Sequence, residues 1–484
     1  MIDQQKIRIF YKYAIIFILI NAVFIYYESF YFALIPFALV IAFFAAVSLD
    51  KVLMFVVALV PLSFPLREYA PNLPIDFWIP TEPLLFGILI LFIFKMITER
   101  KFDRRILRHP ISLAIYVNIG WMAVTVVTSS MPVVSLKFLV ARLWFVVAFY
   151  FIATQLFRKI KNIKNYIWLY ALPLIIVMFY AIGRHITIGL FDKTAAHYVM
   201  NPFFTDHTSY GAIMAMFIPV LVGLGTRGNY AQTKKLLIWV VIMIYLTAFI
   251  FSYTRAAWLS IVAAFGVWAL VRLKIKFKFV LITALGIAMI LLAFRTEILI
   301  SMNQNTQDSS QNMEEHLQSM SNIRTDASNL ERINRWNSAL RMFAERPLFG
   351  WGPGTYMFNY ASFQRSYELT LISTNAGDLG NAHSEYIGPL SESGLLGSLT
   401  YILLIIVVMR SGFKLYHRLE DTELRTLVLS AILGLFTYYL HGFLNNFLDT
   451  DKASAPFWGF TALIVAVDVY HSNKTEKKEE AIAE

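Results

Sequence analysis

Apolar runs separated by short charged breaks occupy most of the chain, from about residue 13 to residue 471. Many runs approach the roughly 20 residues that a helix needs to cross a bilayer. We count about fourteen spans, in a range of twelve to fourteen because one run is short. They are residues 13–27, 29–48, 51–64, 79–97, 110–130, 136–156, 166–190, 208–225, 236–253, 256–271, 279–295, 394–410, 424–444 and 454–471. The pattern predicts an all-α, polytopic integral membrane protein.

Composition supports this prediction. Of the 484 residues, 58% are hydrophobic and 15% are charged, whereas soluble domains carry about 25% charged residues. The net charge of +11 would suggest nucleic-acid binding in a soluble protein, but in a membrane protein basic residues gather in cytoplasmic loops. We therefore expect membrane lipids and no nucleic acid among the partners. The absence of cysteine excludes disulfides and thiolate chemistry.

Basic residues fall on alternate connections between the predicted spans. Clusters of Lys and Arg lie at residues 95–108, 158–164, 227–235, 272–278 and 410–425, and the opposite connections are mostly short and poor in Lys. The positive-inside rule then places both termini in the cytoplasm and the segment 296–393 outside. In a bacterium this side is the periplasmic face of the inner membrane.

The segment 296–393 differs in composition from the rest of the chain. Its polar stretch from Ser301 to Asn329 cannot pack a core. Apolar residues then recur every three or four positions from Leu330 to Phe343, which predicts a helix that Pro347 must end. Because long ordered loops tend to carry function, we expect a partly helical, folded loop.

This reading divides the chain into five parts. We predict N-terminal transmembrane helices in 1–200, central transmembrane helices in 201–295, a periplasmic catalytic loop in 296–393, C-terminal transmembrane helices in 394–471 and a charged cytoplasmic tail in 472–484.

Three arginines are candidates for binding an anion. Arg255 lies at the predicted external turn between two apolar runs, and Arg332 and Arg335 are three residues apart on the loop helix, so they share one side of it. Arg255 is alternatively an interfacial residue that snorkels to headgroups, and the other two are alternatively solvated. Guanidinium groups suit phosphate because of their fork geometry.

His383 is the candidate general base. It precedes the predicted span that starts near Gly394. Imidazole titrates near neutral pH and can take a proton from a hydroxyl nucleophile, although a lone histidine is more often structural. Glu385 and Glu392 are both close enough in sequence to orient it, and spacing does not choose between them.

Three further groups are weaker candidates. Asp449 and Asp451 resemble the paired aspartates with which many sugar-transferring enzymes hold a divalent metal. His207 and His441 are more readily explained as hydrogen-bonded structural residues. Arg142 lies inside a predicted span after Lys137 and is a candidate for facing an internal anionic site.

The candidate residues lie in motifs whose order resembles that of the O-antigen ligase and polymerase superfamily. An arginine in a short external loop is followed by an arginine four residues before a tryptophan, a proline before a Gly-x-Gly-x-Gly turn, and a histidine before a Gly-Leu-Leu-Gly helix start. Here these motifs are Thr254-Arg255-Ala256, Arg332-Ile333-Asn334-Arg335-Trp336, Glu345 to Gly354, Asn381 to Tyr386 and Glu392 to Gly397. The resemblance covers about residues 200–410.

The resemblance implies an integral-membrane glycosyltransferase of the C type. It would move a glycan from an undecaprenyl-pyrophosphate carrier to an acceptor hydroxyl at the outer face of the inner membrane, without a nucleotide sugar, metal or other cofactor. By carry-over from the family, Arg255 and Arg332 contact the pyrophosphate, with Arg335 as the alternative to Arg332, and His383 is the base.

The acceptor stays open at this point. A ligase would use the lipid A-core, a polymerase another lipid-linked repeat unit, and a protein glycosyltransferase a Ser or Tyr hydroxyl; we favour the ligase. A secondary transporter is the alternative from another class, but transporters keep their key charges at mid-membrane, whereas the candidate charges here gather outside.

Overall fold

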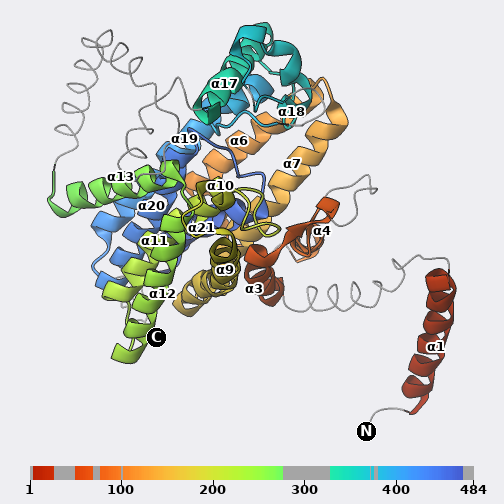
Figure 1. The fold of residues 1–484 in the computed structure, drawn as a ribbon. Helices are drawn as coiled ribbons and strands as arrows, with labels where there is room; N and C mark the ends of the chain where they lie inside the picture. Colours follow the sequence, from red (N-terminus) through yellow and green to blue (C-terminus); the bar gives the residue numbers. More distant parts are fainter. Residues whose placement is uncertain are drawn as a thin grey trace.

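The computed structural model describes residues 4–26, 49–68, 77–99, 102–275, 327–370, 372–374 and 380–472. Most of the long helices gather into a bundle, with α17 and α18 at one end of it (Figure 1). The principal helices are α1 (Gln4–Tyr26), α3 (Leu49–Leu59), α4 (Thr81–Thr98), α6 (Pro110–Val127), α7 (Pro132–Val146), α9 (Ile160–Ile188), α11 (His207–Arg227), α12 (Gln232–Phe251), α13 (Arg255–Arg272), α17 (Ala327–Glu345), α19 (Gly388–Arg418), α20 (Thr422–His441) and α21 (Asp451–Tyr470).

Short elements connect these helices. They are η2 (Val60–Leu62), η3 (Leu66–Glu68), α5 (Arg104–Leu107), the π-helical η4 (Val147–Ile152), α8 (Ala153–Leu156), α10 (Lys193–Ala196), α18 (Tyr356–Asn359), η5 (Tyr360–Phe363) and η6 (Ser366–Glu368). The two strands, β1 (Phe64–Pro65) and β2 (Trp78–Ile79), pair antiparallel, with Phe64 opposite Ile79 and Pro65 opposite Trp78.

Ten helices in the described part of the chain are long and apolar enough to cross a membrane. They are α4, α6, the continuous segment Pro132–Leu156, α9, α11, α12, α13, α19, α20 and α21. Each coincides with a predicted span, so the polytopic all-α prediction is confirmed. The count of fourteen stays a prediction, because the predicted spans 29–48 and 279–295 lie outside the described residues.

Two predicted spans in the described residues are not among these ten helices. The run 51–64 forms α3, which has 11 residues and gives way to η2 at Val60. Pro61, within η2, cannot donate the backbone hydrogen bond of a helix interior. In α1 the apolar part is Tyr11–Tyr26, below the length of the ten candidate spans.

The centre of the bundle is built by α11, α20 and α21, which have mostly buried residues. Small residues let these helices approach closely, as is typical of helix packing in membranes. At Gly434 of α20, a Cβ atom would lie 2.4 Å from the backbone oxygen of Met216 in α11. The contact between α11 and α20 therefore depends on the absence of a side chain there.

Two buried charged side chains in the first turn of α21, Asp451 and Lys452, connect this helix to the N-terminal helices. Lys452 Nζ donates to the backbone oxygens of Val60 and Ser63, the latter at 2.7 Å, and the Ser63 hydroxyl donates to Asp451 Oδ2 at 2.7 Å. Buried charges are tolerated when they are paired and hydrogen-bonded. This network fixes the end of α3 and η2 against the first turn of α21.

The loop between α13 and α19 contains a small folded unit, which we call the cap: α17, α18, η5 and η6. As predicted, α17 ends before Pro347, at Glu345. The apolar core of the cap includes Ala339 and Met342 from α17, which pack with Tyr356 and Tyr360. The cap therefore has its own apolar core and is held as a unit.

Backbone hydrogen bonds attach the cap to the start of α19. The amide of Gly352 donates to the oxygen of Glu392 at 2.8 Å, and the amide of Leu395 donates to the oxygen of Pro347 at 2.9 Å. Gly394 makes this possible: its φ of 68° interrupts α19, and a Cβ there would lie 2.2 Å from the oxygen of Leu348. The Gly-rich turn and the Gly-Leu-Leu-Gly motif thus pack directly on each other.

Candidate functional site

Arg255 is positioned by a tight turn between two membrane helices. It is the first residue of α13 and is half-buried. The preceding Thr254 hydroxyl donates to the backbone oxygen of His207 at 2.7 Å, which holds the turn against the first residue of α11. The turn thus places Arg255 beside the N-terminal end of α11, where the Asp206 side chain accepts from the amides of Thr208 and Ser209 at 2.7 and 2.8 Å.

Arg335 is one of the two predicted arginines of α17, and it is part of the cap's interior. Its side chain is 3% exposed, its Nε donates to Glu331 Oε1 at 2.6 Å and its guanidinium carbon lies 4.2 Å from the centre of the Tyr360 ring. Burial alone would raise the pKa of Glu331, but hydrogen bonds from Ser373 and Arg335 hold it below its ordinary value. The charge of Arg335 is therefore already committed to a carboxylate of the cap.

Arg332, three residues earlier, lies in a different setting. It is half-buried, and its hydrogen bonds include Nε to the backbone oxygen of Leu444 at 3.2 Å and Nη1 to Asn329 Oδ1 at 3.2 Å. Both of these acceptors are neutral groups, and the two contacts help to orient the guanidinium. Leu444 follows α20, so Arg332 bridges the cap and the bundle.

His383 lies in a turn close to both arginines of α17. Its φ is 49°, a left-handed conformation in which His is commoner than bulkier residues. Its backbone oxygen accepts from Trp336 Nε1 at 3.4 Å and its amide donates to Asn381 Oδ1 at 3.1 Å. These contacts define the turn that carries the imidazole.

Burial, together with the positive charges of Arg332 and Arg335, lowers the pKa of His383 to about 4. This corrects the sequence-based expectation that the imidazole titrates near neutral pH. The shift arises because burial and neighbouring cations both disfavour imidazolium. At pH 7 His383 is therefore neutral and able to accept a proton.

Neither glutamate that spacing left open as a partner of His383 is bound to it. Glu385 Oε1 accepts from the Tyr438 hydroxyl at 2.7 Å and from the amides of Phe447 and Leu448 at 2.8 and 2.9 Å. Glu392 Oε1 accepts from the amide of Tyr356 at 3.1 Å. Both carboxylates instead hold backbone segments around the site.

The remaining groups at this end of the bundle converge on the same place. Arg255 and Arg332 are both close enough to His207 to interact with it electrostatically. Arg332 and Asp206 are close enough to His441 to do the same. Arg332 and Asp206 also act on His383. The structure thus brings together side chains from α11, α13, α17, α20 and the turn before α19.

Sequence reasoning gave His207 and His441 structural roles and did not single out Asp206 or His197. His207 stacks on His197 with ring centres 4.1 Å apart, and His441 Nε2 pairs with the Asn445 amide at 3.0 Å. The signal that would have drawn attention to them is position: His207 begins a membrane helix and His441 ends one, at the end that carries Arg255.

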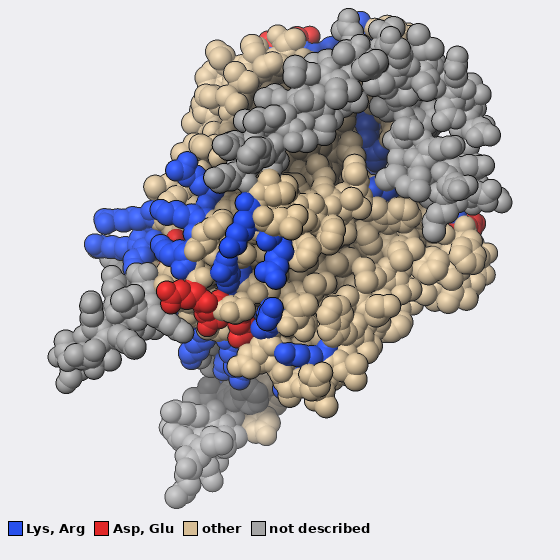
Figure 2. Space-filling view, turned by 90° about the vertical axis from the view of Figure 1, so that its left-hand side faces the viewer, with Lys and Arg blue, Asp and Glu red and all other residues tan. Residues whose placement is uncertain are grey.

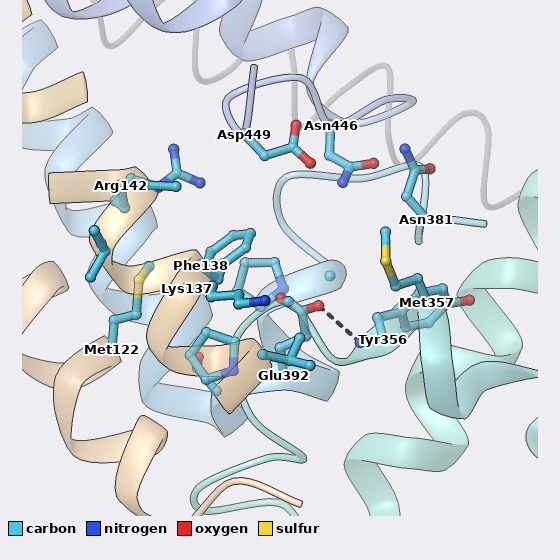
Figure 3. Close-up of a pocket in the computed structure, with 18 of the residues that line it drawn as sticks. Met122, Lys137, Phe138, Arg142, Tyr356, Met357, Asn381, Glu392, Asn446 and Asp449 are labelled. Atoms are coloured by element: carbon cyan, nitrogen blue, oxygen red, sulfur yellow. Dashed lines mark hydrogen bonds between the residues drawn. The ribbon is translucent and has the colours of Figure 1, made fainter. Parts of the chain in front are cut away.

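A large cavity of about 960 Å³ opens beside this cluster (Figure 3). Asn381, Ala382 and Ser384, which flank His383, contribute to its lining. Figure 3 shows Arg142 and Asp449 on one wall, with Lys137 and Glu392 on another. Most of the remaining lining is apolar, so the cavity offers a few polar groups in an apolar setting, as ligand sites do.

Arg142 and Asp449 are the polar groups of one cavity wall. Arg142 Nη1 donates to the backbone oxygen of Leu448 at 2.8 Å. Burial raises the pKa of Asp449 to about 6, and the charge of Glu385 adds to the shift. Asp451, by contrast, is turned to Ser63 and Thr81, so Asp449 and Asp451 do not face one site as a pair.

Comparison with known families bears on this region directly. Residues 238–402 match a family model described as O-antigen ligase. The match spans about a third of the chain and includes all four candidate residues, Arg255, Arg332, Arg335 and His383. No curated protein matches the chain.

The ten apolar helices and this match together define a multi-pass membrane protein with a ligase- or polymerase-type glycosyltransferase domain. The match of the segment 238–402 to the O-antigen ligase family supports the resemblance to the O-antigen ligase and polymerase superfamily. Lipid-linked glycans in the membrane are the substrates that this family implies.

Proposed function

We propose that the protein transfers a glycan from undecaprenyl-pyrophosphate to a hydroxyl of lipid A-core at the periplasmic face of the bacterial inner membrane. The observation that carries this proposal is that Arg255 and Arg332 both lie near His207, and that Arg332 also lies near His383, with Arg255, Arg332 and His383 all inside the segment that matches the O-antigen ligase family. The alternative within the superfamily is a polymerase, whose acceptor is another lipid-linked repeat unit.

The chemistry is a substitution at the sugar carbon attached to the diphosphate. A bond forms between that carbon and the acceptor oxygen, the bond to the diphosphate oxygen breaks, and the acceptor proton leaves. We assign the proton to the neutral imidazole of His383. Arg255 and Arg332 stabilise the negative charge that builds up on the departing diphosphate, the part that a metal ion plays in many sugar transferases.

We assign the acceptor to the cavity beside His383. The cavity is lined by residues on both sides of His383, while Arg255, Arg332 and His207 are not part of its lining. Donor phosphate and acceptor would then approach His383 from different sides. The apolar walls formed by α4 and α7 suit the lipid portion of an acceptor.

The direct test is glycan transfer by the full chain in nanodiscs, from a synthetic polyprenyl-pyrophosphate donor. Product on lipid A-core supports the ligase, and product that grows on the donor itself supports the polymerase.

Transfer activity should survive EDTA. Activity that is lost in EDTA and regained with Mg²⁺ or Mn²⁺ would instead implicate Asp449 in the chemistry. Substrate flux across vesicles without any transfer would contradict both enzymes and favour a transporter.

The pH dependence of transfer should carry the signature of a histidine with a depressed pKa. The pKa of His383 is lowered to about 4, and kcat/KM reports the ionisation of the free enzyme. Protonation of His383 should therefore leave kcat/KM unchanged between pH 8 and pH 5 and lower it below pH 5. A bound diphosphate offsets the cationic arginines, so the inflection in kcat should lie at a higher pH. An inflection of kcat/KM near 6.5 would contradict this environment of His383.

Topology is testable because the chain contains no cysteine. We expect Ser366→Cys, exposed on the cap, to react with an impermeant maleimide in cells whose outer membrane alone has been permeabilised. Glu420→Cys, exposed between α19 and α20, should react only after lysis. The reverse labelling pattern would contradict the proposed orientation, in which both termini are cytoplasmic. It would also contradict a periplasmic position for the site.

A further inference from the structure

A second large cavity lies at the other end of the helices that carry the candidate site. It is a groove of about 830 Å³ between the C-terminal halves of α11 and α13 and the N-terminal half of α20. Its walls are mainly apolar, with Val222 from α11, Phe265 and Trp268 from α13, and Leu429 from α20. Phe265 and Trp268 are exposed and stack on each other with ring centres 5.3 Å apart.

Four basic side chains form the rim of this groove. Arg227 ends α11, Arg272 and Lys274 lie at the end of α13, and Arg425 lies in the first turn of α20. All four are exposed, and none of the ion pairs resolved in the described part of the chain involves them. Figure 2 shows Lys and Arg gathered on the lower part of this face of the molecule.

Two of the acidic side chains at the start of α20 are engaged by other groups: Asp421 accepts from the amides of Glu423 and Leu424. Glu423 accepts from Lys164 Nζ at 2.5 Å and from the amide of Asn229 at 2.8 Å. Arg425 instead extends over the ring of Tyr416, with its guanidinium carbon 4.5 Å from the ring centre, a cation–π contact that leaves its charge intact. The rim is therefore a concentrated positive charge at the mouth of an apolar groove.

We propose that this groove is a binding site for one anionic phospholipid, with its acyl chains between α11, α13 and α20 and its headgroup phosphate on the basic rim. Helix ends with arginine mark the level at which the hydrocarbon region gives way to headgroups. Basic pockets between membrane helices bind anionic headgroups in just this arrangement. Apolar walls and a cationic rim match both parts of such a lipid.

The site is separate from the proposed catalytic centre. Arg255 begins the 18-residue helix α13 and Arg272 ends it, so the two residues are separated by about 26 Å along the helix axis. A lipid in the groove lies between α13 and α20 and so supports the helix that presents Arg255. The proposal concerns a lipid of the surrounding membrane, and it does not depend on the donor or acceptor of the enzyme.

Native mass spectrometry of the full chain in detergent tests the proposal with phosphatidylglycerol and phosphatidylcholine of equal chain length. We expect wild type to retain one phosphatidylglycerol in preference to phosphatidylcholine by at least about tenfold. The triple variant Arg227→Gln/Arg272→Gln/Arg425→Gln should lose this preference, since each basic residue near an anionic headgroup contributes about fivefold in affinity.

The matched control removes three charges from the same end of the bundle but outside the groove: Lys161→Gln/Lys234→Gln/Lys235→Gln. This variant should keep the preference for phosphatidylglycerol. Equal loss in both triple variants would reduce the effect to net charge and overturn the site, as would the absence of any preference in wild type.

A photo-crosslinking residue in the groove identifies the occupant directly. With p-benzoylphenylalanine at Phe265, we expect an adduct of phospholipid mass that depends on the three arginines. The same residue at Val262, exposed on α13 but not lining the groove, should give lipid adducts that do not depend on them. Crosslinking from Phe265 to a peptide of residues 276–326, or displacement of the adduct by polyprenyl pyrophosphate, would overturn the proposal.

Discussion

Replacing His383 with asparagine is expected to lower the turnover of glycan transfer by about 10² to 10⁴, the usual effect of losing a positioned general base. Asparagine is the most informative substitution because it tolerates the left-handed backbone that His383 adopts at φ 49°. The contacts of its backbone with Trp336 and Asn381 do not require the imidazole. The measurement is initial rate per folded molecule in nanodiscs.

Donor binding separates a base from a structural residue. Arg255 and Arg332 are unchanged in His383→Asn, so the affinity for a non-transferable donor analogue should stay within a few-fold of wild type. His417→Asn is the control, since His417 lies exposed in the last turn of α19 and bonds only locally, to the oxygen of Phe413. Normal activity of His383→Asn per folded molecule, accompanied by a lower melting temperature, would show that His383 only stabilises its turn.

The membrane helices were the part of this fold most accessible to sequence reasoning. A span needs a long apolar run, and this requirement is local, so the predicted and observed boundaries of the ten helices agree within about four residues, except at the start of α9 and at both ends of α19. The prediction of a span at 51–64 was wrong because the α-helix ends at α3, just before Pro61. The proline is a local signal, but the prediction gave more weight to the apolar content of the run. The break of α19 at Gly394 depends on a long-range contact with Leu348, which no periodicity reveals.

The sequence was sufficient to select the candidate residues, whose roles stay predictions, but it did not reveal their environments. Arg332 and Arg335 are alike in sequence, and only the fold of the cap distinguishes them, because the partners of Arg335 come from Glu331 and from residues near Thr374. In the same way, the depressed pKa of His383 follows from burial and two neighbouring arginines. Asp206 and His207 belong to the candidate site because the turn at Thr254 packs against the start of α11. The hydrogen bond that holds this turn joins residues 47 positions apart in the sequence.

The contrast between the two arginines of α17 gives the second large effect. Arg332→Ala is expected to lower transfer by about 10² to 10³, the range for loss of one donor to a developing oxyanion, while the protein stays folded. Arg332→Lys should recover only part of the activity, because an ammonium replaces the charge but not the two-pronged contact with phosphate oxygens. Arg255→Ala and Arg255→Lys should behave in the same way, since Arg255 approaches the same cluster from α13.

Arg335→Ala should behave differently, because it strands the buried Glu331 carboxylate and breaking a buried ion pair typically costs about 3 to 5 kcal/mol. Its main effect should be a lower melting temperature, with inhibition of the remaining folded enzyme by inorganic pyrophosphate unchanged, whereas Arg332→Ala should weaken that inhibition. Arg365→Ala, which removes a fully exposed charge from the same cap, is the matched control and should leave both readouts at wild-type values. If Arg335→Ala is inactive per folded molecule and Arg332→Ala is nearly normal, Arg335 is the phosphate ligand and its pairing with Glu331 must open when donor binds.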